Sequence, residues 1–159
     1  MNWYKTATKT AVSVTPAEFG AMTREEKVAL ARKTSLALAT QRLFFTEEYR
    51  RKEWILEYLA QNPSIHPELQ PLFFAEPDLW KNRVLRSLAL NRSITSETQR
   101  LFLTETYKWK NETLWYLEQN ESFLRDFTPD EWLKMKNAVR GRAKLLVLSK
   151  RLEQIAGVP

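Results

Sequence analysis

The chain has 159 residues, a formal net charge of +6, 43% hydrophobic and 12% aromatic residues, and no cysteine. This composition excludes a disordered chain, because it supplies enough apolar surface for a core, and the lack of cysteine excludes disulfides, thiolate metal sites and a cysteine nucleophile. Only three glycines occur beside many strong helix formers, which favours helices over turn-rich β structure.

The N-terminal part is predicted as a flexible segment over 1–13 followed by a helical cap over 14–34. Two Thr-x-x-Glu patterns, Thr15 with Glu18 and Thr23 with Glu26, match the capping box, in which each side chain binds the other residue's backbone N–H. We therefore expect short helices at about 16–22 and 24–33. The N-terminus has no apolar core of signal-peptide length, and no segment approaches the ~18 apolar residues of a membrane span, so we expect a cytoplasmic protein without a membrane partner.

A repeat of 29 residues fills 35–121. We call its copies unit one (35–63), unit two (64–92) and unit three (93–121). The matching columns include the following residues: Ser35, Ser64 and Ser93; Gln41, Gln70 and Gln99; Phe44, Phe73 and Phe102; Glu47, Glu76 and Glu105; Lys52, Lys81 and Lys110; Leu56, Leu85 and Leu114; Leu59, Leu88 and Leu117; and Asn62, Asn91 and Asn120. Such a period is typical of stacked helical hairpins, because one hairpin cannot bury its own apolar side.

Each unit contains two predicted helices, which in unit two cover 67–75 and 81–90. Pro67 suits a first helical turn, and the turn over 76–78 reads Glu-Pro-Asp, which stops a helix. The Asn of the following Asn-x-Ser sequence can close the second helix in a left-handed conformation, and the Ser or the Thr95 position can cap the next helix.

The C-terminal part, 122–159, is predicted as a basic helical cap with eight basic and four acidic residues. Thr128 and Glu131 form a third capping box, and we expect helical structure from about 129 to 156, bent or divided at Gly141. On a continuous helix, four basic residues would form one cationic stripe: Lys136, Arg140, Lys144 and Arg151.

These elements together predict an all-α fold, a single-domain short α-solenoid of about three two-helix repeats between helical caps. The segment 76–97, EPDLWKNRVLRSLALNRSITSE, and Asn-Pro-Ser-Ile-His-Pro-Glu-Leu at 62–69 resemble the leucine-rich repeat variant family, a relative of HEAT-type α-solenoids. The resemblance covers about 28–123, although the family unit is usually several residues shorter and its first helix is often a 3₁₀ turn. It implies a fold and a binding role, and the iron–sulfur cluster of the founding member cannot carry over without cysteine.

No catalytic, cofactor-binding or metal-binding residues are predicted, so we do not expect an enzyme. His66, the only histidine, precedes Pro67 at a position that suits a helix cap, and no nucleophile or orienting partner accompanies it. The repeated Glu and Lys columns predict structural ion pairs, since catalysis needs one site and not three. The repeated Gln column is expected to bind the backbone of a neighbouring turn.

Positions that vary between units can recognise a partner. Outside the apolar stripe of the second helices the sequence has Trp, Tyr and Arg, the residue types that dominate interface hot spots. The predicted partner-binding residues are Trp54, Tyr58, Arg83, Arg86, Trp115 and Tyr116. An alternative is that some of these aromatic residues pack against neighbouring units or the terminal caps, and we expect Trp80 and Trp109 to pack between units.

Two functions follow from these patterns. The first is a protein–protein interaction module that uses the variable aromatic and arginine positions. The alternative is a nucleic-acid-binding protein in which Lys136, Arg140, Lys144 and Arg151 contact phosphates of DNA or RNA. The oligomeric state is not predicted.

Overall fold

The computed structural model of the protein describes residues 11–157, except for the side chains of residues 49 and 50. This part of the chain is all-α, as predicted, and its only β pairing is an isolated bridge between Val12 and Leu36. The elements are α1 (Pro16–Ala21), α2 (Arg24–Ala31), α3 (Leu38–Phe44), α4 (Tyr49–Ala60), the 3₁₀ helix η1 (Pro67–Ala75), α5 (Asp78–Ala89), α6 (Ser96–Thr104), α7 (Lys110–Glu118), α8 (Pro129–Ala138) and α9 (Gly141–Ile155).

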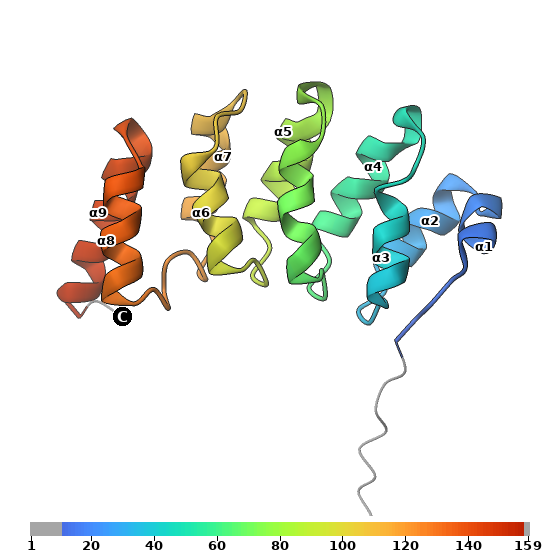
Figure 1. The fold of residues 1–159 in the computed structure, drawn as a ribbon, viewed down its shortest axis with the longest axis horizontal. Coiled ribbons are helices and arrows are strands. Elements are labelled where there is room, and N and C mark those ends of the chain that lie inside the picture. The colour runs from blue at the N-terminus through green and yellow to red at the C-terminus, as the bar shows by residue number, and fades with distance from the viewer. Residues whose placement is uncertain (1–10, 158–159) are drawn as a thin grey trace, which may run out of the picture.

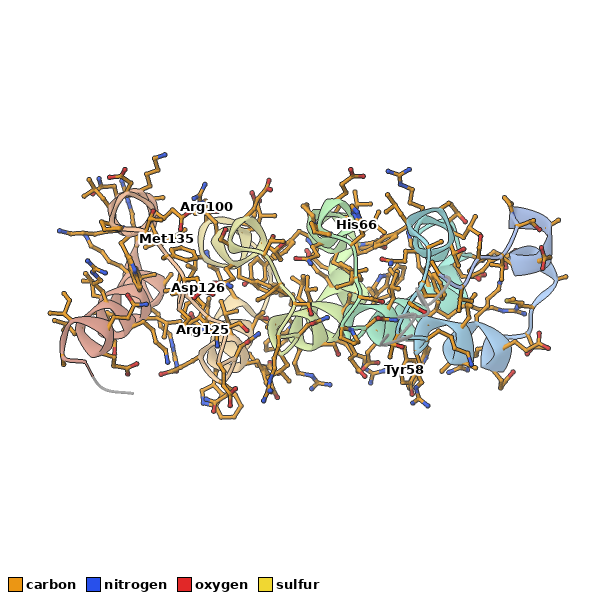
Figure 2. The ribbon with its side chains drawn as sticks, turned by 90° about the horizontal axis from the view of Figure 1, so that it is seen from below. Tyr58, His66, Arg100, Arg125, Asp126 and Met135 are labelled. Atoms are coloured by element: carbon orange, nitrogen blue, oxygen red, sulfur yellow. The ribbon has the colours of Figure 1, made fainter. Side chains whose placement is uncertain are left out.

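The helices lie in two rows along one elongated array (Figures 1 and 2). The first row contains α3, η1, α6 and α8, and the second row contains α2, α4, α5, α7 and α9. Within the second row each helix packs against the next one along the chain. The first helix of each unit therefore faces one side of the molecule and the second helix faces the other.

Capping residues set where the helices begin. All three predicted capping boxes are present, at Thr15, Thr23 and Thr128, and they start α1, α2 and α8. Thr95 caps α6 through its hydroxyl, and His66 caps η1 by accepting a hydrogen bond at Nδ1 from the Glu68 N–H at 3.2 Å. These caps match the helix starts expected at about 16, 24, 67 and 129, whereas α5 begins at Asp78, so the expected start at 81 was wrong by three residues.

The first helix of unit two has the predicted bounds but is a 3₁₀ helix over all nine residues. Pro71 lies at its centre and has no N–H to donate to the residue four positions earlier. The equivalent position in units one and three is arginine, and α3 and α6 are α-helical.

The three repeated phenylalanines Phe44, Phe73 and Phe102 are fully buried. Each makes a T-shaped contact with a ring from the preceding part of the chain, at centroid distances of 5.1, 5.0 and 4.8 Å. The partner rings are Phe19, Phe45 and Phe74. The shared core therefore runs through all units, because each unit contributes one ring and covers that of the next.

The repeated asparagines connect successive units. Asn91 Nδ2 donates to the carbonyls of Ala60 and Asn62 at 2.8 and 2.9 Å, and Asn120 Nδ2 repeats this with Ala89 and Asn91. Asn62 binds Ala31 and Lys33 in the same way. The expectation of a left-handed Asn was wrong, since among the described non-glycine residues only Trp109 and Leu124 have positive φ. The buried amides instead satisfy carbonyls of the preceding unit, where α2, α4 and α5 end.

The repeated glutamines bind the backbone of the following unit or cap, as predicted for a neighbouring turn. Gln70 Nε2 donates to Ser93 O at 3.1 Å, while its Oε1 accepts from the Thr95 N–H at 2.9 Å. Gln41 and Gln99 make the equivalent bonds to the next unit or cap.

Among the described residues, the predicted pairing of the repeated Glu and Lys columns is found between units one and two, while Glu47 of unit one pairs with Lys27 of the N-terminal cap, which is outside the Lys column. Lys52 of unit one binds Glu76 of unit two at 2.9 Å. Lys81 instead pairs with Asp78 on its own helix, and Lys110 donates to the carbonyls of Leu103 and Glu105. The repeated charges therefore do not share one role.

Unit three turns differently from unit two. Its second helix begins at Lys110, three positions later than α5 in the repeat register, and the turn includes Trp109 with φ +65°. Tyr107 is buried there, and its hydroxyl donates to Phe102 O at 2.9 Å. Trp109 is 55% exposed, so the expectation that it packs like the buried Trp80 was wrong.

The structure describes the predicted N-terminal segment in part and the predicted C-terminal segment nearly to its end. Residues 1–10 of the predicted flexible segment 1–13 lie outside the described residues, and Val12 pairs with the backbone of Ser35 and Ala37. The C-terminal segment is divided as anticipated at Gly141, which has φ +61°. Val139 and Arg140 are extended between α8 and α9, so the continuous helix required for the predicted stripe does not exist.

Candidate partner-binding surface

All six predicted partner-binding residues lie on the second row of helices. Trp54 and Tyr58 are on α4, Arg83 and Arg86 on α5, and Trp115 and Tyr116 on α7. Because α4, α5 and α7 are consecutive neighbours, these side chains face one side of the array, where Figure 2 shows Tyr58 at the outer edge. We call them, together with Arg24 and Arg32, the arginine–aromatic surface.

Trp54 lies between two arginines from the neighbouring helices. The guanidinium carbon of Arg24 is 5.0 Å from the indole centroid, and that of Arg83 is 4.6 Å away. A guanidinium at this distance is attracted by the ring quadrupole. Trp54 nevertheless stays 40% exposed, so the contacts fix the indole without burying it.

Each tyrosine of this surface has one arginine over its ring. Arg32, at the end of α2, lies 4.4 Å from the ring of Tyr58, and Arg86 of α5 lies 5.6 Å from the ring of Tyr116. Trp115 contacts Tyr116 edge-on at 5.0 Å and is 50% exposed. Cationic and aromatic side chains thus alternate from α2 through α4 and α5 to α7.

Acidic residues on α4 partly neutralise the centre of this surface. Arg83 lies 3.4 Å from Glu53 and 3.8 Å from Glu57. Burial raises the pKa of Glu57 above its ordinary value, while the nearby Arg83 and Arg86 oppose that rise. Arg83 is therefore held by two carboxylates and one indole.

This arrangement is suited to binding through a preorganised surface. Trp, Tyr and Arg bury a large area, and side chains that already hold one another lose less conformational freedom when a partner docks. The alternative that some of these aromatic residues pack against neighbouring units or the caps holds for Tyr58 and Tyr116, which are half-buried against the core. The rings contact neighbouring helices, but two indoles keep large exposed areas.

Sequence reasoning missed Arg24 and Arg32 because both precede the first complete unit. For Arg32 a signal existed, since the 29-residue register places it in the column of Gln61, Leu90 and Gln119. Arg24 falls in the column of Glu53, Asn82 and Asn111, where nothing indicated an outward-facing position.

The four basic residues predicted to contact nucleic acid do not share one helix. Lys136 is on α8, Arg140 precedes α9, and Lys144 and Arg151 are on α9. Lys136, Arg140 and Lys144 are exposed, whereas Arg151 lies 5.6 Å from the ring of Trp132.

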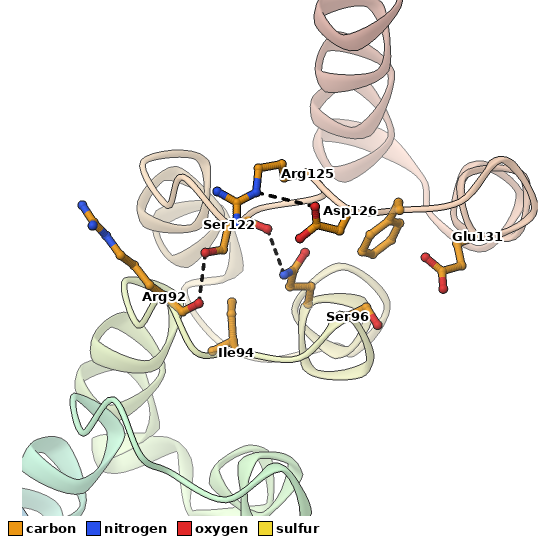
Figure 3. A pocket seen from close by; sticks show the side chains of 9 residues that line it. Arg92, Ile94, Ser96, Ser122, Arg125, Asp126 and Glu131 are labelled. Carbon is orange, nitrogen blue, oxygen red and sulfur yellow. Dashed lines mark hydrogen bonds and ion pairs between the residues drawn. The ribbon is translucent and has the colours of Figure 1, made fainter. Parts of the chain in front are cut away.

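A hollow of about 300 Å³ opens at the junction of unit three with the C-terminal cap (Figure 3). Its polar groups already have partners: Arg125 pairs with Asp126 at 3.6 Å, and Glu131 accepts from the capped Thr128 N–H at 3.1 Å. Ser122 Oγ donates to Arg92 O at 3.0 Å. Of these contacts only the bond from Ser122 to Arg92 joins the C-terminal cap to a repeat unit, and the other two lie within the cap.

Within residues 11–157 no group of three or more His, Asp or Glu side chains could hold a metal ion. The described helices also include none with the length and apolar character needed to cross a membrane.

Comparison with known proteins gives no relative, since no family model, no curated protein and no solved structure matches the chain.

Proposed function

We propose that the protein is a non-enzymatic α-solenoid of the leucine-rich repeat variant and HEAT-like type that docks another protein on its arginine–aromatic surface. The repeated Asn and Gln bonds across each junction support the solenoid, because equivalent residues make equivalent hydrogen bonds to the neighbouring unit. The 3₁₀ helix η1 is also in keeping with the family, whose first helix is often of this kind.

The observation that carries the docking role is the exposed Trp54, held by arginines from two other helices. The buried part of this indole stabilises the hairpin stack, whereas the 40% that stays exposed is apolar area that no described part of the chain covers. A partner that covered Trp54 and Trp115 would bury their exposed apolar area. The loss of side-chain conformational entropy would be small, because neighbouring residues already hold both indoles.

Charge favours a protein partner over nucleic acid at this surface. Units one to three together contain 11 basic and 12 acidic residues, so the repeats as a whole do not attract phosphate, and Arg24 and Arg32 of the N-terminal cap each lie over an aromatic ring. Glu53 and Glu57 beside Arg83 would also repel a nucleic-acid backbone.

The test is a Trp54→Ala plus Trp115→Ala double variant. We expect it to keep the circular dichroism spectrum of the parent and to lose the proteins that the parent captures from its native cell extract. The captured protein is then purified, and its Kd is measured by calorimetry for both forms. Loss of both indoles should weaken binding by about 1,000-fold, since two hot-spot residues at roughly 2 kcal/mol each amount to about 4 kcal/mol.

The matched control carries Arg42→Ala plus Leu72→Ala, two exposed side chains on α3 and η1 in the other row. It should bind as the parent does. An unchanged Kd in the Trp double variant, or equal losses in both double variants, would remove the proposal.

A further inference from the structure

The outward side of α9 has a row of apolar side chains that no described part of the chain covers. Leu145, Leu152 and Ile155 are 69%, 66% and 68% exposed, and Leu148 lies half-buried between them. By helical geometry these residues point away from the side of α9 that packs against the rest of the protein. A contiguous exposed apolar strip of this kind indicates an interaction site.

The spacing of these four residues specifies the kind of partner. They follow one another at intervals of three, four and three residues, which is the a and d pattern of a heptad repeat. On an α-helix this pattern forms a narrow apolar seam whose side chains insert between those of a second helix. The seam therefore fits a helix better than a strand or a loop.

A groove continues the seam toward α8. It has a volume of about 200 Å³, and its apolar lining includes Trp132, Leu133 and Leu148. Leu133 is itself 57% exposed. A helix that lies on the α9 seam would thus also contact α8, as amphipathic helices do when they dock in grooves.

Basic residues border this apolar area. Lys136 and Arg151 line the groove, and Lys144 lies one turn before Leu148 on α9. No acidic residue occurs between Trp132 and Leu152. Two copies of this surface facing each other would bring the same cations together, which disfavours a second copy of the chain. A nucleic acid would leave the leucines without apolar contacts.

We propose that α8 and α9 bind one amphipathic helix of another protein. The apolar side of that helix packs on the seam, and acidic side chains flanking it face Lys136, Lys144 and Arg151. This site is separate from the arginine–aromatic surface and does not depend on the function proposed for it.

The probes are two fluorescein-labelled synthetic peptides of about three heptads, enough to cover α9. Both have Leu at a and d, and one has Glu and the other Lys at the flanking positions. Fluorescence anisotropy with the full chain should show binding of the Glu peptide and at least about tenfold weaker binding of the Lys peptide. A Lys144→Glu plus Arg151→Glu variant should invert this preference, because attractive contacts at the rim become repulsive.

A Leu145→Ser plus Leu152→Ser variant should lose the Glu peptide, while a control with Leu72→Ser plus Leu79→Ser, exposed far from α9, should retain it. Thermal unfolding checks that each variant is folded. Three results would overturn the proposal: equal or absent binding of the two peptides, dimerisation in sedimentation that the Leu145 and Leu152 changes abolish, or displacement of the Glu peptide by duplex DNA.

Discussion

Replacing Asn91 by alanine tests how strongly the asparagines hold successive units together. The side chain of Asn91 is buried and makes three hydrogen bonds, two to the carbonyls of Ala60 and Asn62 and one from the Ser93 N–H at 2.9 Å. Each buried hydrogen bond contributes roughly 1 kcal/mol net, so Asn91→Ala should lower the free energy of unfolding by about 3 kcal/mol. For a chain of this length the melting temperature should fall by about 6–12 °C.

The measurement is urea unfolding followed by circular dichroism, with the slope of free energy against urea compared between variants to confirm that the cooperative unit is unchanged. Asn111→Ala is the control, because Asn111 is exposed on α7 and alanine is the better helix former there. Asn91→Asp should destabilise at least as much as alanine, since a carboxylate cannot donate to the two carbonyls. A loss below about 1 kcal/mol in Asn91→Ala would refute the proposed role of the junction bonds.

Two further predictions concern the backbone and pH. Gly141 has φ +61°, and the space that a Cβ would enter is open, so Gly141→Ala should lower the free energy of unfolding by about 1–2 kcal/mol through backbone strain alone. Gly20 lies inside α1, so Gly20→Ala should raise the free energy of unfolding by up to about 1 kcal/mol in the same urea assay. Equal effects of the two substitutions would contradict this reasoning. Burial raises the pKa of Tyr107 above its ordinary 10.0, so the unfolded chain releases this proton first and stability should fall as pH rises beyond 10.0. Tyr107→Phe should show a shallower decline in urea unfolding between about pH 8 and about 11, and an identical slope would refute the assignment.

Sequence periodicity predicted the parts of the fold that depend on repetition. The Phe44, Phe73 and Phe102 column is buried, and the Gln column binds the next turn, because these core and junction positions have similar surroundings in each unit. The six variable residues of the candidate surface were predicted to lie outside the buried stripe of the second helices, because that stripe has the same register in each unit. They occupy positions that the apolar stripe leaves free.

Features that depend on contacts between distant residues could not be predicted. Leu124 adopts φ +58°, which leucine rarely accepts, where Gln99 binds its N–H and Gln154 its carbonyl. Local sequence favours neither bond. The 3₁₀ form of η1, by contrast, could have been inferred from Pro71, because a central proline removes the N–H that an α-helix requires.

The asparagine bonds run in one direction along the chain. Asn120 binds the carbonyl of Asn91, and Asn91 binds the carbonyl of Asn62. Each of these bonds therefore requires only the C-terminal end of the second helix in the preceding unit. A whole 29-residue segment could therefore be gained or lost during evolution while the asparagine bonds between the remaining neighbours keep the same chemistry. Length is then a trait that selection can adjust independently of the surface that recognises a partner.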